Sequence, residues 1–300
     1  MQFRKAFLTL AFPLLGLAAD SIQVPVWAPE GGSLPAAGLT AQISGEPTEV
    51  LSVQAPADEL LLLVVLDLTD DLASVSQART ALLARIEQLP PNHMVGVLSA
   101  QNGLRVLTEP TADHAKIAAA IQSQQVGGRA GLLETVEQAA NIGSAVIVKS
   151  GVRLAILYVT DSDINNYREA FDNPTVNRSD GNDVSRRMDS LVRERMSRLA
   201  ASLGKTQAPV FIMHLAYRND QLNVAYQTGL ISLTAATGGT ALIARSNAEI
   251  PEYVNSMLDH IIGSYSVKLA LHDPSLKKAD VILLSDTGAL DYRSSYQLQN

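Results

Sequence analysis

The sequence predicts an α/β fold in which an open, doubly wound and mostly parallel sheet is accompanied by a small β-module. Two apolar segments, Leu60–Leu66 and Arg153–Thr160, are each followed by an aspartate, as is typical of strands buried on both faces. Segments with apolar residues at spacings of three and four follow such strands, and Gly and Pro mark the boundaries. This alternation favours a sheet covered by helices on both faces.

The composition describes a chain that can fill a sizeable core. Of 300 residues, 47% are hydrophobic and 18% are charged, with 19 Gly and 13 Pro, so disordered and collagen-like classes are excluded. A net charge of -7 argues against nucleic-acid binding, which clustered Lys and Arg supply. The absence of cysteine excludes disulfides, thiolate nucleophiles, cysteine zinc sites and iron–sulfur clusters.

Residues 1–19 predict a secretory signal peptide. Arg4 and Lys5 precede the apolar run Ala6–Leu17, and small residues follow at Ala18 and Ala19. A buried N-terminal helix is the alternative, but it would show helical spacing rather than a continuous apolar run. The run is too short to span a bilayer, and no later segment is long and apolar enough. We therefore expect a secreted or periplasmic protein without a membrane span.

The mature chain divides into three parts: N-terminal β-strands over 20–57, an α/β domain over 58–263 and C-terminal β-strands over 264–300. The first and last parts show strand patterns without helical periodicity. Because the ends of a compact domain usually lie close together, we expect 20–57 and 264–300 to pair into one small sheet or sandwich. The α/β domain would then be an insertion within this β-module.

The elements follow from apolar alternation or runs for strands and from three- and four-residue spacing for helices. The polar stretch Asp163–Asn182 is too long for a routine connection, which indicates a functional or mobile segment. The segments Ile22–Trp27 and Leu39–Ala55 together are expected to form two or three short strands. The other expected strands are Leu60–Leu66, Met94–Leu98, Leu104–Leu107, Arg153–Thr160, Pro209–Ala216, Ala241–Ala244, Tyr265–Leu271, Val281–Ser285 and Leu290–Leu298. The expected helices are Val75–Leu89, Ala112–Ile121, Leu132–Val148, Val184–Leu203, Gly229–Ala236 and Ala248–Ile262.

Acidic and hydroxyl side chains follow the two buried strands. Asp67 and Asp161 end their strands, and in a doubly wound order with the first and fourth strands adjacent they converge on one crevice. Thr69 and Asp71 lie on the same side of the turn as Asp67. One hydroxyl and three carboxylates form an all-oxygen set, which suits Mg²⁺ or Ca²⁺ rather than a soft metal.

The ordered series of motifs resembles the von Willebrand factor type A domain, and more closely the VWFA-related proteins described from acidobacteria. The resemblance covers about nine tenths of the mature chain, and only the ordered series is specific. It is carried by Leu62-Leu63-Val64-Val65-Leu66-Asp67, Pro91-Asn92-His93-Met94-Val95-Gly96-Val97-Leu98, Leu104–Asp113, Gly127-Gly128, Ile156–Asp161, Thr237-Gly238-Gly239 and the tyrosine-containing β tail.

The resemblance implies a Rossmann-like sheet of six strands and a metal-ion-dependent adhesion site, whose ion leaves one coordination position for a partner's carboxylate. Such sites take Asp-x-Ser-x-Ser from the first loop, a threonine from the second and an aspartate from the third. Asp67 and Asp161 match the aspartates, Thr69 replaces the first serine, and Asp71 stands at the second. The threonine is missing, because Arg129 follows the paired glycines.

The site is therefore degenerate, and two interpretations stay open. A divalent ion, Mg²⁺ or alternatively Ca²⁺ or Mn²⁺, would be held by Asp67, Thr69, Asp71 and Asp161. Alternatively, the aspartates cap helices or turns, or pair with Arg129, whose guanidinium could fill the crevice without any metal.

The sequence contains no recognisable arrangement of nucleophile, base and orienting group, so we expect a protein that is not an enzyme. The leading hypothesis is an exported protein-binding module whose partner meets the 67–71, 127–131 and 161–163 loops. The second is a structural or assembly component of the cell envelope that self-associates through the β-module. The third, a metal-dependent envelope hydrolase, has only the acidic crevice in its favour.

Overall fold

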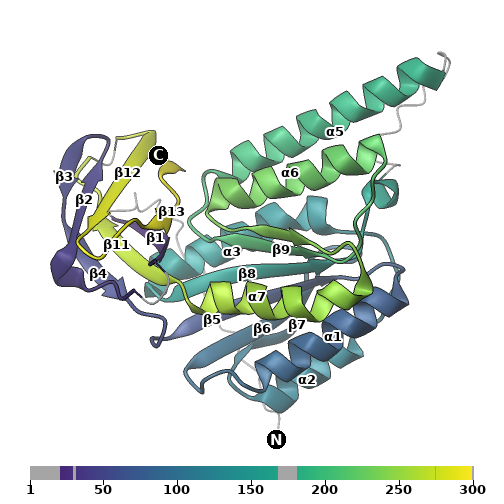
Figure 1. Cartoon of the computed structure of the whole chain (residues 1–300), viewed down its shortest axis with the longest axis horizontal. Helices are drawn as coiled ribbons and strands as arrows, with labels where there is room; N and C mark the ends of the chain where they lie inside the picture. Colours follow the sequence, from purple (N-terminus) through teal and green to yellow (C-terminus); the bar gives the residue numbers. More distant parts are fainter. Residues whose placement is uncertain (1–20, 30–31, 168–180, 274, 299–300) are drawn as a thin grey trace, which may run out of the picture.

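A computed structural model describes residues 21–29, 32–167, 181–273 and 275–298. The predicted signal peptide and most of the polar stretch Asp163–Asn182 lie outside these residues. Figure 1 shows an α/β domain and, at the left, a smaller β-module that contains strands from both ends of the chain.

The α/β domain is built on one six-stranded sheet with the strand order β10-β9-β8-β5-β6-β7. Only β7 runs antiparallel to its neighbour; the other adjacent strands are parallel. The first and fourth strands of this sheet, β5 and β8, are adjacent as expected, and the predicted fold class is confirmed. The strands are β5 (Leu60–Asp67), β6 (His93–Ser99), β7 (Arg105–Thr111), β8 (Arg153–Thr160), β9 (Val210–His214) and β10 (Ala241–Ile243).

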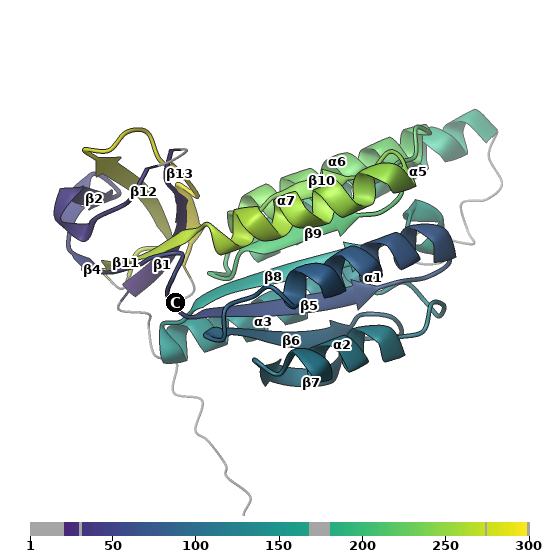
Figure 2. The ribbon, with the colours of Figure 1, turned by 60° about the horizontal axis from the view of Figure 1, so that its bottom comes forward.

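In the described part of the chain, three long helices cover each face of this sheet (Figure 2). Alternate residues of β5 face opposite sides: Leu62 and Val64 pack under α1, α2 and α7, whereas Leu61 and Leu63 pack under α3, α5 and α6. Both faces of the strand are therefore buried, which explains its unbroken apolar run. The helices are α1 (Leu72–Ile86), α2 (His114–Ser123), α3 (Leu132–Ser150), α5 (Gly181–Leu203), α6 (Gln221–Thr237) and α7 (Ile250–Ile262), with the 3₁₀ turns η1 (Ala36–Gly38), η2 (Ile164–Tyr167) and η3 (Asn247–Glu249).

The β-module is a sandwich of two four-stranded sheets, β13-β1-β11-β4 and β14-β12-β2-β3. Strand β1 pairs with β11, and β2 pairs with β12, so each sheet joins strands from the two ends of the chain. The α/β domain is inserted between β4 and β11. The strands are β1 (Ser21–Trp27), β2 (Leu39–Ile43), β3 (Glu46–Thr48), β4 (Val50–Gln54), β11 (Tyr265–Ala270), β12 (Lys278–Ser285), β13 (Asp291–Tyr292) and β14 (Ser295–Gln297).

Helix α6 is longer than expected. The sequence predicted a helix over Gly229–Ala236, but α6 begins at Gln221, because the Asp220 side chain caps its first turn by accepting a hydrogen bond from the backbone N–H of Asn223. The periodicity of the first two turns is masked by polar side chains that face the interior, among them the buried Asn223 and Gln227.

The β-module also contains more strands than expected. Its N-terminal part has four strands rather than two or three, since Ser44 and Gly45, both at positive φ, form a tight turn between β2 and β3. Its last segment, expected as one strand over Leu290–Leu298, is divided into β13 and β14 because Arg293 between them is buried against the α/β domain.

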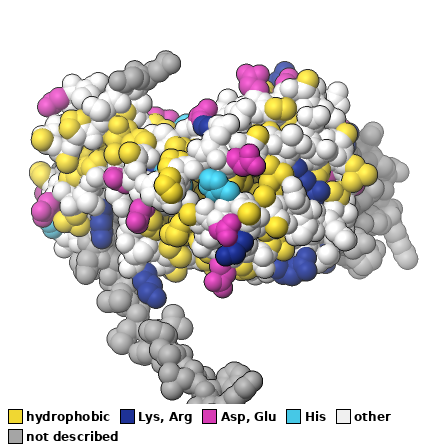
Figure 3. Space-filling model, turned by 90° about the horizontal axis from the view of Figure 1, so that it is seen from below, with side chains coloured by type: hydrophobic (Ala, Val, Ile, Leu, Met, Phe, Trp, Pro, Cys, Tyr) yellow, Lys and Arg dark blue, Asp and Glu magenta, His cyan; other side chains and the backbone are white. Residues whose placement is uncertain are grey.

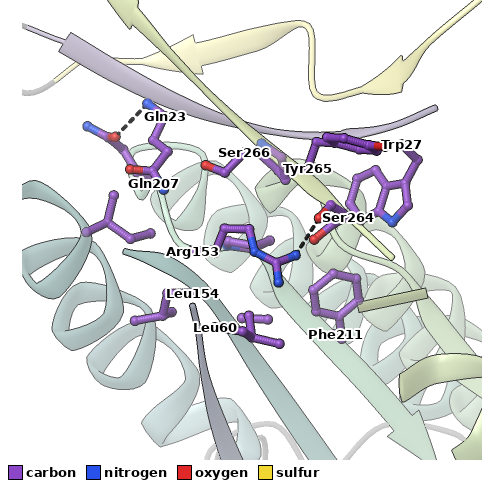
Figure 4. Close-up of a pocket in the computed structure, with 14 residues that line it drawn as sticks. Gln23, Trp27, Leu60, Arg153, Leu154, Gln207, Phe211, Ser264, Tyr265 and Ser266 are labelled. Atoms are coloured by element: carbon purple, nitrogen blue, oxygen red, sulfur yellow. Dashed lines mark hydrogen bonds between the residues drawn. The ribbon is translucent and has the colours of Figure 1, made fainter. Parts of the chain in front are cut away.

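A buried arginine joins the two parts of the molecule. Arg153, at the start of β8, is 2% exposed and donates hydrogen bonds to backbone carbonyls of both connecting segments. On one side it reaches Ile262 at the end of α7 (3.1 Å) and Ser264; on the other it reaches Pro56 (2.9 Å) and Asp58 (3.1 Å). Figure 4 shows this side chain beside a cavity of about 20 Å³, roughly the size of one water molecule.

A second buried arginine does the same from the β-module. Arg293 is 7% exposed and donates from its three nitrogens to the carbonyls of Thr206 (2.7 Å), Ser295 (2.8 Å) and Gly204. Gly204 directly follows the end of α5, so both arginines place positive charge at the negative end of a helix dipole. The orientation of the β-module is thereby fixed by hydrogen bonds to main-chain atoms.

Figure 3 shows hydrophobic side chains exposed over the β-module and beside its junction with the α/β domain, while acidic and basic ones are spread over both parts. Within the residues that the structure describes, none of the helices combines the length and the apolar character needed to span a membrane.

Candidate functional site

The two aspartates that end buried strands lie together at the carboxyl edge of the sheet. Strands β5 and β8 are in register, with Asp67 opposite Thr160, and the backbone N–H of Asp161 donates to the carbonyl of Asp67 at 3.3 Å. Both side chains are inaccessible, with Asp67 0% and Asp161 4% exposed. The convergence expected from the strand order is therefore present in the structure.

Both oxygens of Asp161 hold the turn that follows β5. Oδ1 accepts hydrogen bonds from the backbone N–H (2.5 Å) and the hydroxyl (3.0 Å) of Thr69. Oδ2 accepts from the backbone N–H groups of Asp70 (2.9 Å) and Asp71 (2.8 Å). One buried carboxylate thus satisfies three consecutive N–H groups and fixes the conformation of the loop.

Asp67 performs the same role for the second loop. Its Oδ1 accepts from the backbone N–H of Gly131 (2.9 Å) and its Oδ2 from that of Leu132 (3.3 Å), at the start of α3. The positive end of a helix dipole favours a carboxylate there. Burial nevertheless raises the pKa of Asp67, although these N–H groups and the hydroxyls of Thr160 and Ser162 oppose the rise.

The approach of the second loop depends on a glycine. A side-chain carbon at Gly131 would lie 1.8 Å from the carbonyl oxygen of Ala100, so any larger residue would push α3 away from Asp67. Loop 127–131 is otherwise fixed by Asn102, whose side-chain oxygen accepts the backbone N–H of Arg129 at 3.0 Å.

Asp71 caps helix α1. Its carboxylate accepts the backbone N–H of Ser74 at 3.0 Å and its hydroxyl at 2.7 Å. Burial raises the pKa of Asp71, but the hydrogen bonds from Ser74 outweigh it, so the net shift is downward. Of the four residues predicted as metal ligands, only Thr69 and Asp161 are joined through their side chains. Asp67 is joined to Asp161 through its backbone carbonyl, and Asp71 through its backbone N–H, while the Asp71 carboxylate caps the helix.

Arg129 does not fill the crevice. Its guanidinium is 66% exposed and lies 3.6 Å from Glu134 of α3. In the described part of the chain, no ion pair joins an arginine to Asp67 or Asp161; the nearby Arg218 instead lies 3.8 Å from Asp163. The pairing between Arg129 and an aspartate that the sequence left open is therefore absent, and backbone N–H groups take its place.

Sequence reasoning missed the hydroxyl groups around Asp67. Oδ2 lies within hydrogen-bond distance of the hydroxyls of Thr160 (3.1 Å), Ser162 (2.9 Å) and Tyr167 (3.4 Å). Thr160 and Ser162 flank Asp161 in sequence, so a hydroxyl-Asp-hydroxyl motif after the strand was a signal that could have found them. Tyr167 carried no such signal, because its position depends on how η2 folds back.

His214, at the end of β9, lies beneath the same cluster. It is fully buried, its Nε2 lies 3.0 Å from the carbonyl oxygen of Ser162, and its Nδ1 accepts the backbone N–H of Ala216 at 3.4 Å. Burial lowers the pKa of His214 to about 4, so the ring is neutral at pH 7. His214 is therefore a core histidine whose two ring nitrogens both have main-chain partners.

The arrangement does not fit a directly bound divalent ion well. Each carboxylate oxygen of Asp67 and Asp161 already accepts at least one hydrogen bond from nearby groups. An ion would have to displace them, and the second loop offers no hydroxyl in place of the missing threonine. Over the described residues, no group of three or more His, Asp or Glu side chains could hold a metal ion. The predicted metal site stays a prediction.

No model of a known protein family matches the chain, and no curated protein matches its sequence. Solved structures similar to the chain include von Willebrand factor type A domains, as the sequence resemblance predicted. The narrower resemblance to acidobacterial proteins is not tested by them.

Three of these structures are given with their sequence identity, the share of each chain that is covered and the TM-score. A von Willebrand factor type A protein from Catenulispora acidiphila is 11% identical, with 93% of this chain and 73% of that chain covered and a TM-score of 0.44. The SpRpn10 VWA domain is 14% identical, with coverages of 67% and 95% and a TM-score of 0.42. An aerotolerance-related membrane protein from Bacteroides fragilis NCTC 9343 is 12% identical, with coverages of 67% and 98% and a TM-score of 0.39.

Proposed function

We propose that the protein is an exported, non-enzymatic binding module with a degenerate adhesion site of the von Willebrand factor type A kind. A protein partner meets the crevice bordered by the 67–71, 127–131 and 161–163 loops. One observation carries this proposal. The carboxylate of Asp161 accepts hydrogen bonds from the backbone N–H groups of the 69–71 turn, while the next residue, Leu72, is 70% exposed. An apolar side chain on a fixed turn loses little entropy on binding.

Other exposed groups at the same edge of the sheet as Leu72 support a protein partner. Tyr217, in the loop after β9 at the same edge of the sheet, is 41% exposed, and the guanidinium of Arg245 lies 5.5 Å from its ring centre. Partly exposed aromatic and apolar groups beside charges are typical of binding hot spots. Asp70 is also exposed, and burial together with the charges of Asp161 and Asp163 raises its pKa, which indicates a negative local potential.

This potential constrains the binding mode. The family resemblance implies contact with a partner's carboxylate through an ion, but without a cation a carboxylate beside Asp70 is repelled. A partner that reaches the turn directly must offer apolar or basic groups. Binding that strengthens on adding Mg²⁺ would support the carboxylate mode, whereas binding that weakens with salt alone would support the direct mode.

A non-enzymatic role is supported by the state of the polar groups beneath the crevice. His214 is buried, and both ring nitrogens have main-chain partners, so it has no free nitrogen to act as a base. The hydroxyl of Ser162, whose carbonyl contacts His214, is also buried and donates to Asp67 rather than facing the surface. Neither group can reach a substrate without opening the loops.

The proposal is tested by site-specific photocrosslinking in extract of the cell envelope. A photoreactive residue at Leu72 should capture a defined partner, and Asp161→Asn should abolish that capture because the turn is no longer held. The matched control is Val106, which is 62% exposed on β7. The same probe at this position should not capture the partner that is captured from position 72. Equal capture at both positions, or capture unaffected by Asp161→Asn, would contradict the proposal.

A second candidate, assembly within the envelope, is favoured by one observation. On the outer face of β12, Ile282 and Leu284 are 44% and 58% exposed and follow one another along the strand. Adjacent apolar residues on an exposed sheet face favour self-association. Light scattering over a range of concentrations should detect dimers that Ile282→Thr with Leu284→Thr removes; a monomer at every concentration argues against assembly.

A further inference from the structure

A groove separate from the crevice lies where the α/β domain meets the β-module. It has a volume of about 540 Å³, within the range of small-molecule sites. Trp27 of β1, Met257 and His260 of α7, Leu242 of β10 and Tyr292 of β13 contribute its apolar and aromatic lining. Because these residues come from both parts, the groove exists only when the two parts are docked.

One wall of the groove is a rigid aromatic pair. The rings of Trp27 and His260 are stacked, with centroids 4.4 Å apart and an interplanar angle of 1°. The indole N–H of Trp27 donates to the backbone carbonyl of His260 at 2.7 Å, and Phe211 meets both rings edge-on. A surface fixed in this way is organised before any ligand arrives.

Among the charged side chains that line the groove, only the negative one is free to pair with a ligand. Asp291 is exposed, opposite Trp27 in the β1–β13 pairing, and takes part in no ion pair within the described chain. Arg293 also lines the groove, but its three nitrogens donate to main-chain carbonyls and its guanidinium lies 4.0 Å from the ring centre of Tyr296. Burial lowers the pKa of His260, so its ring is neutral at pH 7.

We propose that this groove binds a small aromatic cation, with its ring against the Trp27–His260 wall and its positive charge beside Asp291. The aromatic rings that line the groove provide dispersion, and the carboxylate provides the charge complement. An anion of the same shape meets Asp291 and finds no free cation in the lining. The occupant proposed is a free amine; a peptide with neighbouring aromatic and basic side chains carries the same groups and is an outcome that the test separates.

The single tryptophan of the chain makes the test specific, since Trp27 itself lies in the groove. Phenethylammonium should change the tryptophan fluorescence in a saturable way, and phenylacetate, with the same ring and the opposite charge, should bind at least tenfold more weakly. A blocked Phe-Arg dipeptide distinguishes the sources: tighter binding than phenethylammonium points to a peptide, weaker binding to a free amine.

Two variants complete the experiment on the intact protein. Asp291→Asn should weaken phenethylammonium about fivefold, as expected for one exposed charge pair, whereas Asp286→Asn, an exposed acid elsewhere in the β-module, should leave it unchanged. Ala235→Phe, at an exposed position of α6 that lines the groove, should block binding. The proposal is overturned if neither compound saturates, if both bind equally, or if Asp291→Asn has no effect.

Discussion

The two edges of the central sheet bury charges of opposite sign, and each edge supplies main-chain hydrogen-bond partners for its buried charge. At the carboxyl edge, Asp67 and Asp161 accept hydrogen bonds from backbone N–H groups. At the other edge, Arg153 donates to backbone carbonyls, as Arg293 does from the adjoining β-module. Helices α1, α3, α6 and α7 begin at the first edge and end at the second, so each buried charge matches the main-chain groups and the helix dipoles of its edge.

The difference lies in what the charges hold. The aspartates hold loops within one domain and leave exposed residues free beside them. The arginines hold two parts of the chain together through hydrogen bonds to main-chain carbonyls. Loss of an aspartate therefore releases a loop, whereas loss of an arginine loosens the junction between the α/β domain and the β-module, so the largest effects on stability are expected at that junction.

Replacing Arg153 should have the largest effect. Arg153→Met keeps the length of the side chain but removes a buried guanidinium that serves four carbonyls, so we expect a loss of about 3–5 kcal/mol in the free energy of unfolding. Denaturant titration measures it. Arg105→Met, at an exposed arginine that begins β7, should cost less than about 0.5 kcal/mol. Equal effects of the two variants would show that the junction does not depend on Arg153.

Acid should act next, through the buried histidine under the crevice. His214 has a pKa of about 4 in the folded protein and about 6.5 in the unfolded chain. Its contribution is complete above about pH 6.5 and declines as pH falls toward 4, where about 3 kcal/mol is lost. His214→Gln should remove this part of the dependence in denaturation measured at several pH values.

The matching variant is His272→Gln, at an exposed histidine after β11, which should leave the pH dependence intact. At the opposite edge, burial and the charge of Arg153 also lower the pKa of His93, although the backbone of Asp58 and Pro56 opposes this shift. His93→Gln should therefore remove a further part of the acid sensitivity. A stability curve unchanged by either buried substitution would contradict the assignment of neutral rings.

The buried charges at the carboxyl edge could be predicted from the sequence, whereas those at the opposite edge could not. Apolar runs ending in aspartate, together with parallel topology, predicted that Asp67 and Asp161 meet. Nothing predicted Arg153 or Arg293, because their partners are carbonyl groups, which every residue carries. Pattern reasoning detects side chains that gather, but it cannot detect a side chain whose partners are main-chain atoms distant in sequence.

The same limit explains the partial success at the site. The four candidate ligands lie at one edge, yet their oxygens are engaged by N–H groups that the sequence does not display. Capping and ion binding use the same residue types, so only the path of the loops separates them. The β-module was predicted as a pairing of the two ends, while its strand divisions depended on a turn at Ser44 and Gly45 and on the burial of Arg293.

A smaller effect is expected from Asp161→Asn. The amide presents N–H where the Asp70 and Asp71 N–H groups need an acceptor, which should cost about 2 kcal/mol and expose those amides to hydrogen exchange. Asp163→Asn is the matched control, since Asp163 is partly exposed and lies 3.8 Å from Arg218; we expect at most about 0.5 kcal/mol. Exchange at the turn that is equally slow in both variants would mean that Asp161 does not hold it.

The smallest effect is expected from metal ions. Calorimetric titration of the protein with Mg²⁺, Ca²⁺ or Mn²⁺ should give no heat at millimolar levels, because an ion must displace N–H donors from Asp67 or Asp161. Arg129→Thr separates the two reasons for this, since it restores the hydroxyl at the family's position while leaving those donors in place. If this variant binds Mg²⁺, the missing ligand alone disables the site; if it stays silent, the hydrogen bonds at the carboxyl edge exclude the ion, as the arrangement of Asp161 over three N–H groups indicates.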